Sequence, residues 1–332
     1  MEVFNGVSNN HSLILNATTS WIASVFNRYW YIGVIILLIF MIGFILNLII
    51  LFMMVKIDKI KFSSDIFFLH LTVCDLFICL VFSAYCIIVF KTYSLGWPEQ
   101  IMTPVCRVSI FLLHVCSSLH VLTLVLIAKD RYRLILYPTR PALKSRTAYI
   151  QLASILVLSV CFPAVTLTDV IADSRFKFIC IHSWEVNGRH QIQLLGTCYF
   201  FLIIFLLPGT VIAYCHFRVI KKLRQVSAIT KERFGHTNSR HKDKAIRMLI
   251  CVSVLFFIMG VPVSITLVNT IYLNANGANI TNYDHEQMMI QGTLPNLLIF
   301  LAPLHNPVIY LTKKNMIYKY LCVRNRHTNQ SD

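Results

Sequence analysis

The stretch Ala128-Lys129-Asp130-Arg131-Tyr132-Arg133 follows directly on a long apolar run that begins near Cys106. Inside a soluble core, each of these adjacent ionised groups would lose its hydration at a cost of several kcal/mol. At the end of a membrane helix the same charges lie at the boundary with water, where Arg131 can pair with Asp130 and still face a solvent-filled cleft. The stretch therefore predicts that a membrane-spanning helix ends here.

Composition supports a membrane protein. The chain has 332 residues, of which 57% are hydrophobic and only 13% charged, and its mean hydropathy is +0.67. These values lie outside the usual range of soluble globular domains. The apolar runs lack the alternation of barrel strands, and unpaired backbone groups are costly in hydrocarbon, so the spans are predicted to be helices. The expected fold class is an all-α membrane protein.

Seven apolar segments reach the roughly 20 residues needed to cross a bilayer. They run roughly from Trp30 to Val55, Ser64 to Phe90, Thr103 to Leu136, Thr147 to Val170, Ile192 to Ile220, Lys244 to Ile271 and Met288 to Thr312, and the fourth helix itself is expected to end near Pro163. The first segment is too long and too late for a cleaved signal peptide, and we interpret it as a retained helix. Residues 1–29 are expected to form an extracellular tail, 30–312 a seven-helix domain, and 313–332 a short amphipathic eighth helix and cytoplasmic tail on the inner leaflet.

The basic residues predict the orientation. Six of the 30 Lys and Arg residues lie on the side of the N-terminus, and 24 lie on the other side, clustered at 56–61, 129–146, 218–247 and 313–326. By the positive-inside rule the N-terminus is outside and the C-terminus is cytoplasmic, in the plasma membrane. The net charge of +16 is therefore read as a topology signal with a secondary contact to anionic membrane lipids, and not as nucleic-acid binding. Glycosylation sequons fall on the predicted outer side at Asn10, Asn16 and Asn279.

Cysteine positions add one cross-link. Of eleven cysteines, eight lie within the predicted spans and Cys322 lies in the tail, where it is a candidate for palmitoylation. This leaves Cys106 and Cys180 as the only pair in the oxidising compartment. A disulfide between these two is predicted, which would tie the loop after the fourth helix to the outer end of the third.

Polar residues inside the spans are costly, and each needs a partner. Asp75 lies near mid-membrane, and His120, about three helical turns outward of Arg131, lies at a matching depth. We hypothesise that Asp75 and His120 pair. Asn47 in the first span is interpreted either as an interhelical hydrogen bonder or as part of a polar core network. Two further histidines in the spans are expected to make ordinary interhelical hydrogen bonds: His70 and His114.

Prolines mark the deformable parts of the later spans. Pro208 is expected to kink the fifth helix and Pro262 the sixth, because proline lacks the backbone N–H. The seventh span carries Asn306-Pro307-Val308-Ile309-Tyr310, a pattern that predicts irregular backbone. Between the fifth and sixth helices, residues 218–247 are too polar to pack and are expected to form a solvated loop with helical ends.

In this order and at these depths, the motifs resemble a rhodopsin-like (class A) G-protein-coupled receptor over nearly the whole chain, including the 25-residue spacing from Cys106 to Arg131. The resemblance implies that Arg131 leaves Asp130 and meets a heterotrimeric G protein when the sixth helix swings outward about Pro262. It implies a coupling surface of Asp130, Arg131, Tyr132, Ile135 and Pro138. It also implies a switch and polar core of Asn47, Asp75, His120, Pro262, Asn306, Pro307 and Tyr310.

Several positions depart from the pattern of that family. Gly260 stands where most members have a tryptophan above the sixth-helix proline, so that rotamer switch cannot operate. His216 occupies the place of a tyrosine that usually reaches the arginine, and Tyr214 is expected to lie on another face. Thr139 replaces a larger apolar residue. These departures leave open a receptor-like protein with weak or no coupling. Where members bind sodium, this chain has His120 facing Asp75, so we expect insensitivity to sodium.

The ligand is argued by exclusion. Leu113 replaces the aspartate of amine receptors, and Phe300 replaces the lysine that binds retinal. A lipid or a peptide end is therefore favoured, in a mainly apolar cavity. The candidate lining residues are Leu113, His114, Ser117, Leu267 and Asn296.

Other classes of function remain as alternatives. A proton-sensing receptor is suggested by the extracellular histidines His11, His182, His190 and His285, together with His114 and His120 within the spans. A transporter is less favoured, since no repeat is seen. An enzyme is not expected, because phosphate-loop and hydrolase motifs are absent, and neither a cofactor nor a metal is implied.

Overall fold

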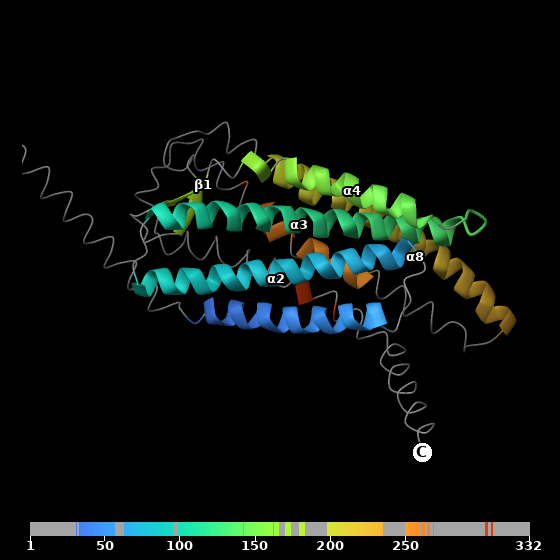
Figure 1. Cartoon of the computed structure of the whole chain (residues 1–332). Helices are drawn as coiled ribbons and strands as arrows, with labels where there is room; N and C mark the ends of the chain where they lie inside the picture. The colour runs from blue at the N-terminus through green and yellow to red at the C-terminus, as the bar shows by residue number, and fades with distance from the viewer. Residues whose placement is uncertain are drawn as a thin grey trace, which may run out of the picture.

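The helices pack side by side with their long axes roughly aligned (Figure 1). The computed structural model describes residues 31, 33–56, 63–95, 99–141, 143–161, 163–165, 170–173, 179–182, 198–234, 250–258, 260–262, 264, 265, 268, 303, 304 and 307. Within these ranges, four helices are long and apolar enough to cross a membrane: Gly33–Lys56, Ser63–Ile88, Gln100–Leu136 and Phe201–Val226. Two shorter apolar helices are Ser145–Cys161 and Ile250–Pro262. A helical multi-span membrane protein is therefore confirmed.

The central element is α3 (Glu99–Leu136), which contacts α2 (Ser63–Leu95), α4 (Ser145–Cys161) and α8 (Leu207–Phe234). The first helix lies along α2 on the side away from α4 (Figure 1). The predicted second and third spans agree with α2 and α3 within about one helical turn at each end. Because α3 contacts three other helices, its side chains reach most parts of the bundle.

The fourth span is shorter than predicted. The apolar segment is predicted to run to Val170, but α4 ends at Cys161 and a 3₁₀ turn, Pro163–Val165, follows. Proline lacks the N–H for the next helical hydrogen bond and disfavours helical backbone in the residue before it. The expected stop near Pro163 is confirmed, and the extension of the span to Val170 is wrong.

A short β-hairpin follows the fourth helix in the chain. Strand β1 (Val170–Asp173) pairs antiparallel with β2 (Ile179–His182), with Ala172 opposite Cys180. Valine and isoleucine at four of these eight positions favour extended backbone, whereas the segments are far too short to span a membrane. β1 also contacts α3, so the hairpin lies against one end of the central helix (Figure 1).

The fifth span opens with an irregular turn. Phe200–Leu206 is π-helical, and the Leu207 N–H donates to the Leu202 carbonyl, five residues back, immediately before Pro208. A π turn widens the backbone where the proline ring would otherwise clash with a carbonyl. This is the irregularity expected at Pro208.

The polar segment after the fifth span is partly helical. The helical end predicted for the first part of 218–247 is present, since α8 continues to Phe234. Lysine, arginine, glutamine and alanine are good helix formers, and the first glycine of this segment is Gly235.

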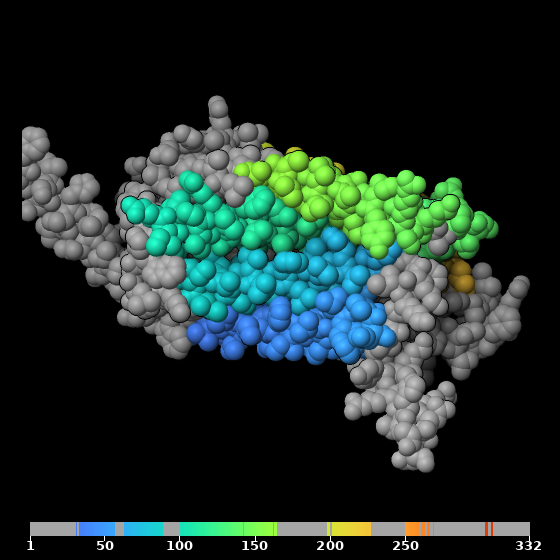
Figure 2. Space-filling model, in the orientation of Figure 1, coloured from blue at the N-terminus to red at the C-terminus, as the bar shows by residue number. Residues whose placement is uncertain are grey.

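Apolar side chains gather between α2, α3 and their neighbours, and also cover the outside. Phe67, Leu71, Ile212 and Val219 are fully buried. Large apolar residues are nevertheless exposed on outer helix faces, such as Leu158 of α4 at 61%. Figure 2 shows the first helix, α2, α3 and α4 forming one continuous face. Exposed apolar helix faces of this extent are typical of proteins surrounded by lipid.

Candidate functional site

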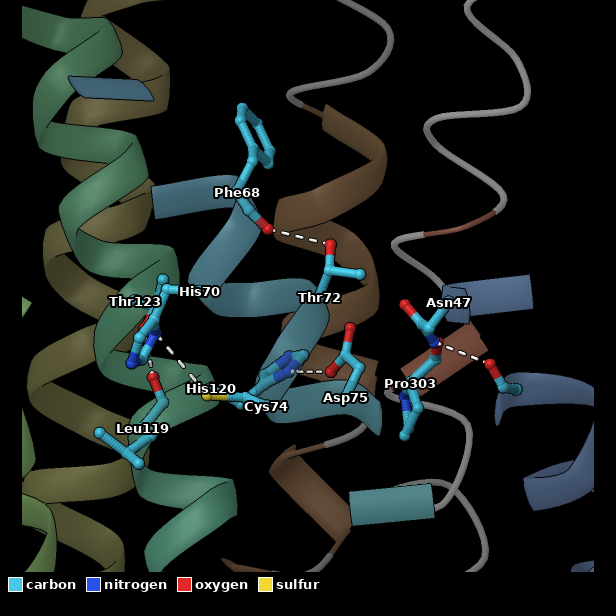
Figure 3. A network of polar contacts seen from close by, with 11 residues as sticks. Asn47, Phe68, His70, Thr72, Cys74, Asp75, Leu119, His120, Thr123 and Pro303 are labelled. Atoms are coloured by element: carbon cyan, nitrogen blue, oxygen red, sulfur yellow. Dashed lines mark hydrogen bonds and ion pairs between the residues drawn. The ribbon is translucent and has the colours of Figure 1, made fainter. Parts of the chain in front are cut away.

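Buried polar contacts join α2 to α3, and others join the first helix to Pro303, in the middle of the bundle (Figure 3). The central contact is between His120 Nδ1 of α3 and Asp75 Oδ1 of α2, at 2.7 Å. The Asp75 side chain is 0% exposed and that of His120 is 5% exposed. The contact expected from the matching depth of the two residues is therefore present. An imidazole N–H at Nδ1 supplies the donor that a carboxylate out of reach of solvent requires.

A second set of contacts lies one turn further along the two helices. His70 Nδ1 of α2 lies 3.0 Å from the Thr123 hydroxyl of α3, and Thr123 donates to the Leu119 carbonyl at 2.6 Å. The Cys74 thiol lies 3.6 Å from the same His70 nitrogen. His70 is thus an interhelical hydrogen bonder, as predicted. Together with the Asp75 contact, these bonds fix the register of α2 against α3.

Asn47 links the first helix to the last described segment. Its side-chain amide donates to the Gly43 carbonyl at 2.9 Å and to the Pro303 carbonyl at 2.8 Å, and the residue is fully buried. The carbonyl of Pro303 lies 256 positions away in sequence, so this amide connects the first helix to a distant part of the chain. Asn47 Oδ1 has no hydrogen-bond partner among the described residues. Of the two interpretations left open for Asn47, an interhelical bond is present.

The charged end of α3 differs from the prediction. Asp130 is 1% exposed, and its Oδ1 accepts a hydrogen bond from the Ser63 hydroxyl at 3.0 Å. The Arg131 guanidinium instead lies over the Phe68 ring, 5.8 Å from its centroid. Within the described part of the chain, Asp130 and Arg131 form no ion pair. Adjacent helical residues point about 100° apart, so these two side chains leave α3 in different directions.

Two residues of the fifth helix, α8, contact neighbouring helices near the charged end of α3. His216 Nδ1 of α8 lies 2.7 Å from the Ser253 hydroxyl of the sixth helix. Tyr214 lies on another face of α8, as expected, and its ring centroid is 6.0 Å from that of Tyr132 on α3. Tyr137 lies a further 6.0 Å from Tyr132. The aromatic contact between α3 and α8 therefore comes from Tyr214, while His216 connects α8 to the sixth helix.

The remaining coupling candidates lie close to Arg131 in sequence and space. Ile135 is half-buried in the last turn of α3, and Pro138 is exposed in the turn that follows. Arg133 donates to the Pro141 carbonyl at 3.1 Å, which holds that turn against the helix end.

The candidate ligand residues are described only on α3. Leu113 packs against the cluster formed by the first helix and α2 around Phe40 and Phe82. His114 and Ser117 are half-buried on the same helix. Leu267 and Asn296 lie outside the described residues.

The predicted disulfide is described at one end. Cys106 is disulfide-bonded, and the side chain of Cys180, on β2, lies outside the described residues, so their pairing stays a prediction. Eight further cysteines whose side chains are described are free.

Other predicted residues are only partly described. Pro262 ends the helix Ile250–Pro262, and Pro307 is helical and buried. Several predicted features lie outside the described residues: the sequons at Asn10, Asn16 and Asn279, Asn306 and Tyr310 of the seventh span, and Cys322 with the predicted eighth helix. Among the described residues, no group of three or more His, Cys, Asp or Glu side chains is placed to hold a metal ion.

Sequence reasoning missed several partners in this site. Ser63 donates a hydrogen bond to Asp130, and the Phe68 ring lies under the Arg131 guanidinium. The Ser253 and Thr123 hydroxyls lie within hydrogen-bond distance of His216 and His70, respectively. Serine and threonine are ordinary residues in membrane helices and often bond their own preceding turn, so their type carries no signal of a distant partner. Only the register between helices selects them.

Comparison with known proteins supports the same assignment. The profile of the family "7 transmembrane receptor (rhodopsin family)" matches residues 46–310. Neuropeptide FF receptor 1 from Rattus norvegicus is 26% identical over 293 residues, covering 82% of this chain and 65% of that relative. Galanin receptor 2b from Danio rerio is 28% identical over 249 residues, covering 73% and 62%. Uracil nucleotide/cysteinyl leukotriene receptor from Rattus norvegicus is 23% identical over 291 residues, covering 86% and 80%. The chain thus spans slightly less than two thirds of the length of the first two relatives.

The family match covers most of the chain, and it includes the polar network, the charged end of α3 and the sixth-helix proline. The apolar helices and the charged boundary at Arg131 agree with it independently of any alignment. This chain belongs to the rhodopsin family of seven-transmembrane receptors.

Proposed function

We propose that the protein is a receptor with an extracellular N-terminus that transmits the binding of an extracellular ligand to a heterotrimeric G protein by outward movement of its sixth helix. The observation that supports this is the charged end of α3. Asp130 has its own buried donor in Ser63, and Arg131 lies apart from it over Phe68. A cation–π contact of this kind contributes roughly 0.5–2 kcal/mol. When Arg131 moves toward a partner, Asp130 keeps the Ser63 hydrogen bond on Oδ1, while its buried Oδ2 has no hydrogen-bond partner among the described residues.

The contact between His216 and Ser253 supports movement of the sixth helix as the transmitting step. It is a single hydrogen bond between side chains of two helices, near the predicted cytoplasmic end. One neutral hydrogen bond contributes about 1 kcal/mol net. This bond is one of the contacts between the two helices that outward movement would break, and the ligand must offset all of them through its difference in affinity between the two states.

For the ligand we propose a peptide. Neuropeptide FF and galanin receptors are among the relatives, although a uracil nucleotide/cysteinyl leukotriene receptor is as well. The hairpin of β1 and β2 supports the choice, because among the described residues each strand is paired on one side only. An extended peptide can add to such an edge through its backbone. Leu113 and the half-buried Ser117 of α3 then remain candidates for contacts with its apolar and polar groups.

Weak coupling is the second candidate, favoured by the position of His216. Its bond to Ser253 points it to the sixth helix rather than to Arg131, so it does not take the role expected of a tyrosine at that position. For the proton-sensing alternative, the side chains of His114 and His120 are described within the bundle, and those of His11, His182, His190 and His285 lie outside the described residues.

G-protein dissociation in cells tests the proposal. The unmodified chain, Arg131→Ala and the control Arg133→Ala are compared at equal surface expression, both without ligand and with neuropeptide FF, galanin and a peptide library. Arg133 lies on the same helix but contacts the Pro141 carbonyl. We expect the signal of the unmodified chain to be lost in Arg131→Ala and retained in Arg133→Ala. An equal signal from all three would overturn coupling through Arg131. The absence of any signal at every expression level would favour the weakly coupling alternative.

A further inference from the structure

Residue 260 of the sixth helix has no side chain, and a ring from the fifth helix fills its place. A Cβ atom built on Gly260 would lie 2.4 Å from both Cδ2 and Cε2 of Phe205. Real Cβ atoms essentially never come within 3.0 Å of another heavy atom. The Phe205 ring therefore rests directly on the backbone of the sixth helix, where only glycine admits it.

The fifth helix has a matching glycine. A Cβ atom on Gly209 would lie 3.1 Å from Cε1 of Phe256 and 3.3 Å from Cε1 of Phe257, both on the sixth helix. Each helix thus places aromatic rings against a glycine of the other. We call this reciprocal contact of Phe205 with Gly260, and of Phe256 and Phe257 with Gly209, the glycine–phenylalanine interlock.

The three rings also hold one another. Phe205 stacks on Phe256 with centroids 5.9 Å apart and planes 6° apart, and it meets Phe257 edge-on at 6.0 Å and 85°. Phe256 and Phe257 meet at 5.7 Å and 90°. Stacked and edge-to-face pairs at these separations are favourable beyond the area that they bury. Phe205 cannot turn away from Gly260 without breaking both contacts.

The backbone irregularity of the fifth span positions this ring. Phe205 lies in the π-helical segment Phe200–Leu206, and the α-helix resumes at Leu207. A π turn inserts one residue and so rotates the residues before it relative to those after it. Because of this rotation, Phe205 and Gly209 face different directions. The fifth helix can therefore place the Phe205 ring against Gly260 and also accept the Phe256 and Phe257 rings at Gly209.

We propose that the glycine–phenylalanine interlock sets the resting position of the sixth helix, with Phe205 as the positioning residue. Pro262 lies two residues beyond Gly260, so rotation of the Ile250–Pro262 helix must draw Phe256 off the Phe205 ring. The signalling role of such a rotation rests on the proposed function, whereas the resting position itself does not.

The test is a graded set of variants in the purified full-length chain. Gly260→Ala places a methyl group 2.4 Å from the ring, Gly209→Ala one at 3.1 Å, and the control Val261→Ala changes a residue that is 41% exposed on the neighbouring face. Overpacking of this kind lowers the melting temperature by about 5 °C for Gly260→Ala. We expect a smaller loss for Gly209→Ala and little change for Val261→Ala. Adding Phe205→Ala to Gly260→Ala should recover most of the loss, because the methyl group then enters the space left by the ring.

A distance measurement separates positioning from simple packing. Nitroxide labels on the exposed Cys251 and on Arg140→Cys measure the distance between the sixth helix and the turn after α3. For this measurement Cys161, Cys198 and Cys322 are replaced by serine. We expect Gly260→Ala to broaden the distance distribution and shift it to longer values, and the double variant to restore it. Neither readout involves a G protein. An unchanged distribution in Gly260→Ala, or equal melting losses in Gly260→Ala and Val261→Ala, would overturn the proposal.

Discussion

Replacing His120 by leucine tests the buried contact at the centre of the polar network. The substitution removes the donor at 2.7 Å from Asp75 Oδ1, and the carboxylate stays in a position with 0% exposure. Removing one partner of a buried pair costs about 3–5 kcal/mol. Asp75 makes further contacts, so the lower end of that range, about 3 kcal/mol, is the better figure here. At about 2 °C per kcal/mol for a chain of this size, the melting temperature falls by about 6 °C.

The chain carries its own reporter for the assay. Cys74, Cys79 and Cys215 are free and buried, so their labelling by a thiol-reactive fluorophore reports unfolding of the purified receptor once Cys161, Cys198, Cys251 and Cys322 are replaced by serine. The matched control is His70→Leu, because His70 contacts a neutral hydroxyl, Thr123, which also bonds the Leu119 carbonyl. We expect the control to lose about 1 kcal/mol, a third of the effect at His120.

A double variant supplies the result that would refute the reasoning. Replacing both Asp75 and His120 by leucine removes the buried charge together with its partner, so part of the stability lost in His120→Leu should return. If the losses of Asp75→Leu and His120→Leu simply add in the double variant, the two side chains are not coupled and the network does not depend on their contact.

Three further predictions concern the same bundle. The melting temperature of the unmodified chain should be equal in sodium chloride and choline chloride, because His120 already contacts the carboxylate of Asp75. The variant His120→Ser should show a melting temperature that increases with sodium. A sodium response of the unmodified chain would contradict this prediction. Asn47→Leu loses the hydrogen bonds to the Gly43 and Pro303 carbonyls and should lower the free energy of unfolding by about 2 kcal/mol. The same thermal assay measures this loss, with the lipid-facing substitution Ile49→Ala as the control. Equal losses in the two variants would contradict the prediction. Ser63→Ala removes the donor to Asp130 and should cost about 1–3 kcal/mol, with Ser154→Ala, an exposed serine bonded within its own helix, as the control.

Much of the architecture follows from local sequence. The apolar runs predict the spans because a helix needs a minimum length to cross hydrocarbon, and Pro163 marks the end of α4 because proline cannot continue the hydrogen-bond pattern. One error was local too. The hairpin of β1 and β2 was missed because its short strands lie in a connecting segment.

Single residues of the site were predictable when their chemistry was costly. A carboxylate in the membrane demands a partner, so Asp75 directed attention to His120, which lies at the same depth. The surroundings of Arg131 were not predictable in this way. Adjacent charges in sequence suggested a pair of Asp130 with Arg131, but the helix turns the two side chains apart, and their partners come from α2.

The sequence by itself determined which segments span the membrane, where charge meets water, and which buried polar groups need partners, because these depend on the free energy of moving each group out of water. Only the tertiary structure decided which partner each group has. Ser63 for Asp130, Ser253 for His216 and Phe205 for the empty place at Gly260 all depend on the rotation and register of one helix against another. Those quantities are set by the packing of the whole bundle, to which no single stretch of sequence corresponds.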